Sequence, residues 1–154
     1  MVKSGENKMF TGEYHHTIDA KNRLAIPSDI RDKVNTKIEG KGFFITIGLD
    51  GCLFMYTPKE WQNIVQKINQ LPFTNEKARQ FQRLFFSKAQ EIPDYDPQGR
   101  ILISQNLKDI AKIQKKAVIV GVSNRIEIWD ETRWKNFESE HSKEYEKIAE
   151  DLFK

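Results

Sequence analysis

The chain has 154 residues, 38% of them hydrophobic and 31% charged, a composition that can bury a core and excludes global disorder. It has no apolar run near the roughly 20 residues that a membrane-spanning helix needs, and its single cysteine, Cys52, excludes an internal disulfide or a cysteine metal cluster. We therefore expect an intracellular protein without metal or cofactor, in which residues 1–8 form a polar, flexible leader.

The net charge of +3 is unevenly distributed along the chain. Residues 1–126 hold 20 Lys and Arg against 13 Asp and Glu, whereas residues 127–154 hold 5 against 9. The excess of positive charge in residues 1–126 suits a polyanionic partner, because cationic side chains displace counterions from phosphates. Many basic proteins bind no nucleic acid, so this observation favours that class of partner without establishing it.

The first elements in chain order form a β-hairpin followed by a helix. Residues 10–18 are rich in β-forming side chains and lead into a turn at Asn22. Asparagine tolerates the positive φ that such a turn requires, so Arg23–Ile26 is predicted to be the returning strand. Ser28 is predicted to cap a short helix that runs through Val34.

A second strand pair and two helices complete the first half. Gly40 and Gly42 predict a loop over residues 35–42, and a strand pair follows within residues 43–56. The sequence Thr57-Pro-Lys-Glu60 is a capping box with proline at the first helical position, which predicts the start of a helix. A connecting helix is predicted over residues 75–88.

The second half repeats this order. A turn with Gly99 precedes a short apolar run, Ser104 is predicted to cap a helix, and a strand pair is expected within residues 117–129. Asp130 is predicted to cap one longer helix that reaches the C-terminus. Its apolar stripe is expected to pack on the core, and its terminal part could instead cover a neighbouring subunit.

The two halves therefore read as an internal duplication. Matched positions lie 77 residues apart around the turns and 73 residues apart later, so the first copy carries four extra residues, placed in residues 35–42. A module of about 45 residues is too small to bury a full core alone, and its strand edges need pairing. The matched segments are Asp19–Ile26 with Asp96–Ile103, Ile45–Gly48 with Val118–Gly121, Tyr56 with Trp129, and Trp61 with Trp134.

These segments resemble the MraZ family of bacterial regulators over residues 9–150, nearly the whole chain. The similarity is carried by the opening Met9–Asp19, by two Asp-x-x-x-Arg turns that match the family's Asp-x-x-Gly-Arg signature, and by Ile128-Trp-Asp-Glu-Thr-Arg-Trp134. The resemblance implies an α+β, mainly β fold: a duplicated AbrB/SpoVT-like swapped-hairpin barrel with flanking helices. Asn22 departs from the family's glycine, whereas Gly99 retains it.

The resemblance also implies a function. The family binds repeated double-stranded DNA sites upstream of the division and cell-wall gene cluster, including its own promoter, and forms ring-like homo-oligomers in the cytoplasm at the nucleoid. The expected organisation is a first module at residues 13–60 and a second at 89–133, with connecting helices at 61–88 and a C-terminal helix at 134–154. No membrane contact is expected.

Carried over by position, the family's presumed DNA-contacting arginines are Arg23 and Arg100. The fork of arginine can bind guanine or phosphate at two points, while Lys21 and Asn22 lie in the same turn. Arg31 and Lys33 could extend the basic patch from the short helix. In the alternative interpretation, each arginine only pairs with the aspartate that opens its turn, and the helix charges are solvated.

Other interpretations have less support. His15 and His16 are adjacent, so on a strand they would point to opposite faces and are not expected to bind a metal together. Asp94 and Asp96 have no supporting nucleophile or phosphate loop, so an enzyme is not expected; Cys52 is expected to be buried in a strand and inert. Two rival functions remain, an antitoxin-like or RNA-binding protein of the same fold and an oligomeric scaffold.

Overall fold

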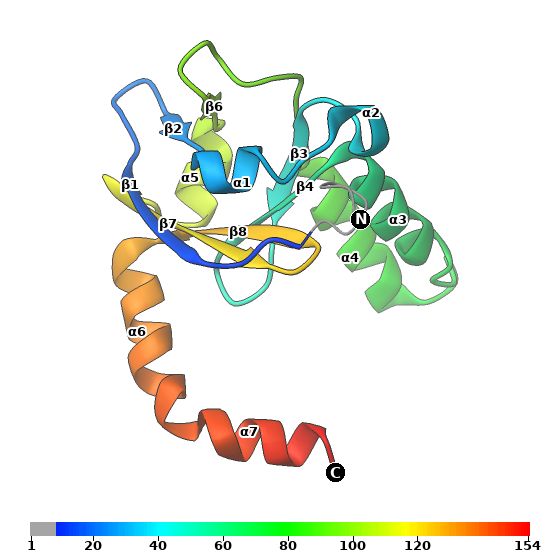
Figure 1. Ribbon diagram of the computed structural model, residues 1–154. Helices are drawn as coiled ribbons and strands as arrows, with labels where there is room; N and C mark the ends of the chain where they lie inside the picture. Colours follow the sequence, from blue (N-terminus) through cyan, green and yellow to red (C-terminus); the bar gives the residue numbers. More distant parts are fainter. Residues whose placement is uncertain (1–8) are drawn as a thin grey trace, which may run out of the picture.

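A computed structural model describes residues 9–154, so the leader expected over residues 1–8 lies outside the described residues. The described elements alternate between strands and helices in two similar series (Figure 1). No described helix is both long and apolar enough to cross a membrane. In chain order the elements are β1 (Glu13–Thr17), β2 (Arg23–Ala25), α1 (Ser28–Arg31), α2 (Thr36–Glu39), β3 (Phe43–Ile47), β4 (Leu53–Tyr56), α3 (Pro58–Asn69), α4 (Glu76–Ser87), β5 (Gln90–Ile92), β6 (Arg100–Leu102), α5 (Gln105–Ile110), β7 (Lys116–Val122), β8 (Arg125–Asp130), α6 (Glu131–His141), the 3-10 helix η1 (Ser142–Glu144) and α7 (Tyr145–Leu152).

The strands of the two halves are interleaved. Six of them form one sheet in the order β1-β7-β8-β4-β3-β5, and β2 pairs with β6 in a separate two-stranded ribbon. All of these pairings are antiparallel. The first strand of each half thus pairs with the later hairpin of the other half: β1 with β7, and β5 with β3. This exchange is the duplicated swapped-hairpin fold that the resemblance implied.

The core lies between the main sheet and the β2–β6 ribbon with its adjoining helices. Leu24 of β2 and Ile101 of β6 oppose each other and are fully buried. They belong to one cluster with sheet residues such as Ile45, Met55 and Ile128. Because both halves contribute to this single cluster, neither half buries its apolar residues alone.

Several predicted helix starts are confirmed. Thr57 accepts a hydrogen bond from the Glu60 backbone N–H at the start of α3, and Asp130 accepts one from the Arg133 N–H at the start of α6. These two caps occupy equivalent positions of the duplication. Ser104 likewise caps α5.

The first short helix and the loop after it differ from the prediction. Ser28 is not the cap: it is the first helical residue of α1, Pro27 precedes it, and α1 ends at Arg31 rather than Val34. Pro27 and Ser104 are the equivalent positions, so the duplication itself marks the residue that precedes each helix. The predicted loop over residues 35–42 contains α2, whose first turn is capped by the side chain of Asn35.

Three further elements differ from the expectations: two strands and the C-terminal helix. The strand expected over residues 10–18 is regular only over Glu13–Thr17, because Gly12 adopts a φ of 94° and leaves Phe10 in an isolated bridge. The strand β5, which pairs with β3, was not predicted as a strand, since three residues carry too little periodicity. The single C-terminal helix is broken by η1, so that α6 and α7 run in different directions (Figure 1).

Candidate nucleic-acid interface

The turn between β1 and β2 is organised by one carboxylate. Asp19 Oδ1 accepts hydrogen bonds from the backbone N–H groups of Lys21 and Arg23, both at 2.9 Å, and Oδ2 accepts one from Arg23 Nε at 2.7 Å. Asn22 completes the turn with a φ of 63°. The three hydrogen bonds that this one carboxylate accepts fix both the backbone of the turn and the direction of the arginine that follows it.

The turn before β6 has the same geometry. Asp96 Oδ1 accepts from the N–H groups of Gln98 and Arg100 at 2.9 Å, and Oδ2 accepts from Arg100 Nε at 2.7 Å. Gly99 takes the place of Asn22, with a φ of 76°. The aspartate–arginine pairing that the alternative interpretation expected is therefore present in both modules.

Both carboxylates are held in the charged form. Hydrogen bonding from the Arg23 backbone, assisted by the Arg23 side chain, lowers the pKa of Asp19. For Asp96, desolvation raises the pKa, but the hydrogen bonds from Arg100 and Gln98 together outweigh it and the pKa is lowered. Each turn therefore keeps an ion pair at neutral pH.

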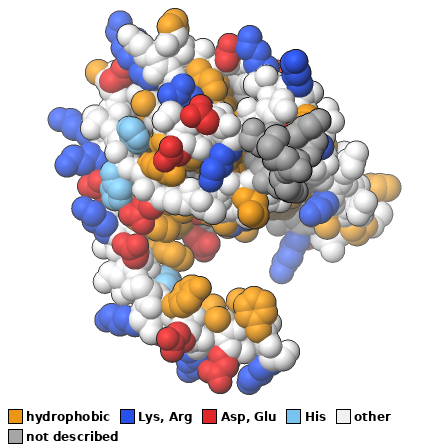
Figure 2. All heavy atoms as spheres, viewed as in Figure 1, with side chains coloured by type: hydrophobic (Ala, Val, Ile, Leu, Met, Phe, Trp, Pro, Cys, Tyr) orange, Lys and Arg blue, Asp and Glu red, His pale blue; other side chains and the backbone are white. Residues whose placement is uncertain are grey.

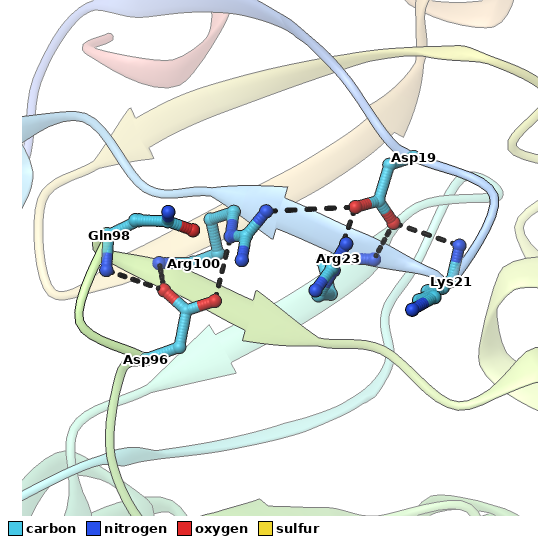
Figure 3. Close-up of polar contacts among 6 residues, drawn as sticks. All are labelled: Asp19, Lys21, Arg23, Asp96, Gln98 and Arg100. Carbon is cyan, nitrogen blue, oxygen red and sulfur yellow. Dashed lines mark hydrogen bonds and ion pairs between the residues drawn. The ribbon is translucent and has the colours of Figure 1, made fainter.

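The β2–β6 ribbon brings the two arginines onto one face. Arg23 is opposite Leu102 and Arg100 is opposite Ala25, so these four side chains share the face turned away from the buried Leu24 side. Arg100 Nη1 lies 3.8 Å from Oδ2 of Asp19, the oxygen that also binds Arg23 (Figure 3). One carboxylate thus holds two guanidinium groups from different modules close together.

The ion pair with Asp19 does not use all the hydrogen-bond donors of Arg23. Asp19 engages Arg23 through Nε, and the two terminal amino groups of Arg23 have no partner among residues 9–154. About a third of the Arg23 side chain is exposed. A guanidinium whose Nε is fixed and whose outer edge is open is oriented for two-point binding to phosphate or guanine.

Each turn is also contacted by a cation from the helix of the other module. Arg31 of α1 donates to the carbonyl of Ile26 and lies against Gly99, where an added Cβ would be 2.8 Å from the Arg31 Cζ atom. Lys108 of α5 donates to Asn22 Oδ1 at 3.2 Å. The structure therefore adds Lys108 to the predicted set, and the repeat spacing of 77 residues, applied to Arg31, would have found it.

Five of the six predicted residues are brought together at the ribbon and its turns: Lys21, Asn22, Arg23, Arg31 and Arg100. Lys21 is exposed at the first turn. Lys33 lies elsewhere, with its Nζ 3.4 Å from Thr11 Oγ1 beside the start of β1. In Figure 2, Lys and Arg side chains are spread along the top and the left edge of the view, and this region includes the place where Figure 1 shows the β1–β2 and β5–β6 turns.

The other singled-out residues have identifiable surroundings. His15 lies between two carboxylates, 2.7 Å from Glu13 and 3.0 Å from Glu131, and no group of three metal-binding side chains is arranged for an ion within residues 9–154. Asp94 pairs with Lys41 at 3.2 Å. Cys52 is buried as predicted, immediately before β4, and desolvation raises the pKa of its thiol to about 12.

The fold and this site define a class: a duplicated swapped-hairpin protein whose two Asp-x-x-x-Arg turns present cations on one shared ribbon. Comparison with known proteins agrees with that class. The family model described as "MraZ protein, putative antitoxin-like" matches residues 9–84 and again residues 85–154. A relative from Lactobacillus gasseri, named transcriptional regulator MraZ, is 48% identical over 144 residues, which cover 94% of this chain and 96% of the relative. The chain belongs to the MraZ family.

Proposed function

We propose that this chain is a sequence-specific transcriptional regulator that binds double-stranded DNA through the exposed face of the β2–β6 ribbon. The observation that carries the proposal is the pair of identical turns that orient Arg23 and Arg100 on this face. The name of the Lactobacillus gasseri relative supports the same class of function.

The shape and charge of the ribbon fit DNA. The major groove of B-form DNA admits a two-stranded β-ribbon, and its base edges are recognised by arginine. In this proposal Arg23 and Arg100 contact bases or their adjacent phosphates. Lys21, Arg31 and Lys108 contact phosphates, which position the protein without specifying sequence. Asp19 and Asp96 hold the arginines and remain outside the DNA contact, because a carboxylate repels phosphate.

The targets in this proposal are repeated short sites upstream of the division and cell-wall gene cluster, including the chain's own promoter. Several self-associated copies would engage several repeats, so that one bound site raises the effective concentration for the next. The modules at residues 13–60 and 89–133 would contribute one turn each to every copy. The protein would act in the cytoplasm, at the nucleoid.

The test is a fluorescence anisotropy titration with the DNA upstream of this gene against a scrambled duplex, at two salt concentrations. We expect Arg23→Ala and Arg100→Ala each to weaken binding to the specific duplex by about 1–3 kcal/mol, or roughly 5- to 150-fold. Lys59→Ala on α3 is the matched control, because it removes one exposed charge away from the ribbon.

A double-stranded RNA competitor separates DNA binding from RNA binding. The major groove of A-form RNA is too deep and narrow for a ribbon to read, so RNA should compete weakly. Equal, weak binding of both DNA duplexes by wild type and all variants would contradict the proposal and favour the scaffold. Stronger binding to RNA would favour an RNA-binding function.

A further inference from the structure

The two arginine turns lie in surroundings of different charge. Each turn is contacted by the short helix of the other module. Residues 17–23 and 105–116, at the first turn, contain six Lys and Arg and two Asp. The equivalent residues 94–100 and 28–43, at the second turn, contain five Lys and Arg and five Asp and Glu. The duplication therefore has one strongly basic turn region and one without net charge.

Two lysines that follow α5 have no internal partner. The side chains of Lys112 and Lys115 are exposed, and neither makes a hydrogen bond or an ion pair within residues 9–154. They adjoin the first turn, because the Lys115 carbonyl accepts a hydrogen bond from the Ile18 N–H at 2.8 Å. The segment then continues into β7, which pairs with β1 (Figure 1). Two unpaired cations thus lie beside the turn that carries Arg23.

The matching positions at the second turn are neutralised or uncharged. Gly42 is the equivalent of Lys115, and Lys41 beside it forms an ion pair with Asp94 at 3.2 Å. Thr17 takes the place of Asp94 at the first turn. The difference in charge between the two turns therefore comes from substitutions at equivalent positions of the same fold.

The backbone at Lys112 would suit glycine better than lysine. Ile113 N–H donates to the Lys108 carbonyl and Lys112 N–H to the Asp109 carbonyl, both at 3.0 Å, and Lys112 has a φ of 55°. This helix-ending motif usually has glycine at the left-handed position, where a Cβ is unfavourable. A cation also favours the negative end of a helix, but Lys108 already provides one in the last turn of α5. Local structure thus leaves the charge of Lys112 unexplained.

The two lysines border a shallow hollow in the surface. Its volume is about 460 Å³, and its polar walls consist of three lysines, two glutamines and one aspartate. The aspartate is already engaged, since Asp109 Oδ1 accepts a hydrogen bond from Gln105 Nε2 at 2.7 Å. Cations with amide donors beside them suit a phosphate group. The polar lining residues are Gln105, Lys108, Asp109, Lys112, Gln114 and Lys115.

We propose that Lys112 and Lys115 bind backbone phosphates of the DNA that flanks the segment contacted by the β2–β6 ribbon, on the side of the first turn only. The inference rests on the proposed function, because it requires the ribbon to lie on DNA. Phosphate contacts fix register and orientation without specifying sequence. A single basic end therefore gives the chain a defined direction on each DNA site.

The first experiment is an anisotropy titration of the full chain with a single-site duplex at several salt concentrations. Lys112→Gly/Lys115→Gln should weaken binding roughly 60-fold at 0.1 M salt and lower the slope of log K against log salt by about 2, because each phosphate contact contributes about 0.9. The specific and the scrambled duplex should be affected equally. Lys37→Gln/Lys41→Gln is the matched control, since it removes the same two charges beside the second turn, and it should leave the slope unchanged.

Two further measurements separate binding from a structural role. Lys112→Gly alone should weaken DNA binding roughly eightfold, yet the midpoint of urea denaturation should stay the same or rise, because glycine suits the positive φ. Trimming the flanking base pairs from one end of the duplex should weaken binding of wild type, whereas trimming the other end should not. The double lysine variant should bind both trimmed duplexes equally.

An unchanged salt slope in the double lysine variant, or equal losses in that variant and the control, would overturn the inference. A lower urea midpoint for Lys112→Gly with unchanged DNA binding would assign Lys112 to the helix end instead. Arg23→Ala distinguishes the two proposals, because it should reduce the preference for the specific duplex, which the lysine variant should retain. If only Arg23→Ala has an effect, the flanking contact alone is wrong; a wild type that binds neither duplex overturns both proposals.

Discussion

At the residue scale, the two turns show how one carboxylate can organise a site. Asp19 and Asp96 each bind two backbone N–H groups and the Nε of the arginine four residues later. The pairing is structural, as the alternative interpretation expected, and it also leaves the outer edge of Arg23 open. The structural and the binding roles of these arginines are therefore compatible.

The turn residue with positive φ gives a prediction for stability. Gly99→Ala should lower the free energy of unfolding by about 1–2 kcal/mol, because a Cβ disfavours the left-handed conformation, and it should also displace Arg31, whose Cζ lies 2.8 Å from the added atom. Gly99→Asn should cost less, since Asn22 holds the equivalent turn at a φ of 63°. Urea denaturation measures the difference, with the exposed neighbour Gln98→Ala as control. If Gly99→Ala and Gln98→Ala lowered the free energy of unfolding equally, the left-handed conformation of Gly99 would not be what makes this position sensitive.

At the scale of elements, an exposed histidine joins the first strand to the last long helix. His15 of β1 lies between Glu13 of the same strand and Glu131, the first residue of α6. Hydrogen bonding to Glu131, and then to Glu13, raises the pKa of His15 above 6.5. The hydrogen bond with His15, and after it the hydrogen bond with Lys135, lowers the pKa of Glu131, and the charge of Lys116 acts in the same direction. The start of α6 is thus joined to β1 through an ion pair that depends on pH.

This arrangement predicts a pH-dependent melting temperature. The folded state binds the His15 proton more tightly than the unfolded state, so the contribution to stability is complete below the unfolded pKa and is lost as pH rises through the folded pKa, above 6.5. Calorimetry of wild type and His15→Gln should show a difference in Tm that is largest below about pH 6.5 and shrinks over the range above it. Since His15 is exposed, solvent screening makes the effect small. Parallel curves over this range would rule out the predicted role of His15.

At the scale of the whole molecule, the exchange of strands makes the two halves one folding unit. β1 depends on β7 for its pairing, and β5 depends on β3. The ribbon that carries both arginines takes one strand from each half. The proposed DNA-binding surface therefore exists only when both halves are folded together.

Splitting the chain tests this dependence. Residues 1–88 alone should give no folded monomer, because β1, β2 and β4 would each lack their partner strand from the other half. The fragment should be unfolded or should pair with a second copy of itself, and mixing with residues 89–154 should restore a cooperative unfolding transition. Circular dichroism and sedimentation measure these states. A cooperatively folded, monomeric fragment would show that the exchange is dispensable.

Much of this protein follows from the sequence, because local contacts determine it. The turns at Asn22 and Gly99 follow from tolerance of positive φ, and the caps at Thr57, Ser104 and Asp130 follow from side chains that reach the next turn of their own helix. The duplication is visible in spacing alone. Each of these features is fixed by residues within a few positions of one another.

Only the tertiary structure decided which strands pair and which side chains meet across the halves. Apolar periodicity shows which face of a strand is buried but not which strand it pairs with. The β2–β6 ribbon and the contact between Lys108 and Asn22 join distant segments, so they could not be predicted from the sequence of either segment alone. The break at η1 and the exposed face of α7 likewise depend on what surrounds the helix. Local chemistry determined the two arginine turns, and long-range strand pairing determined that they form one surface.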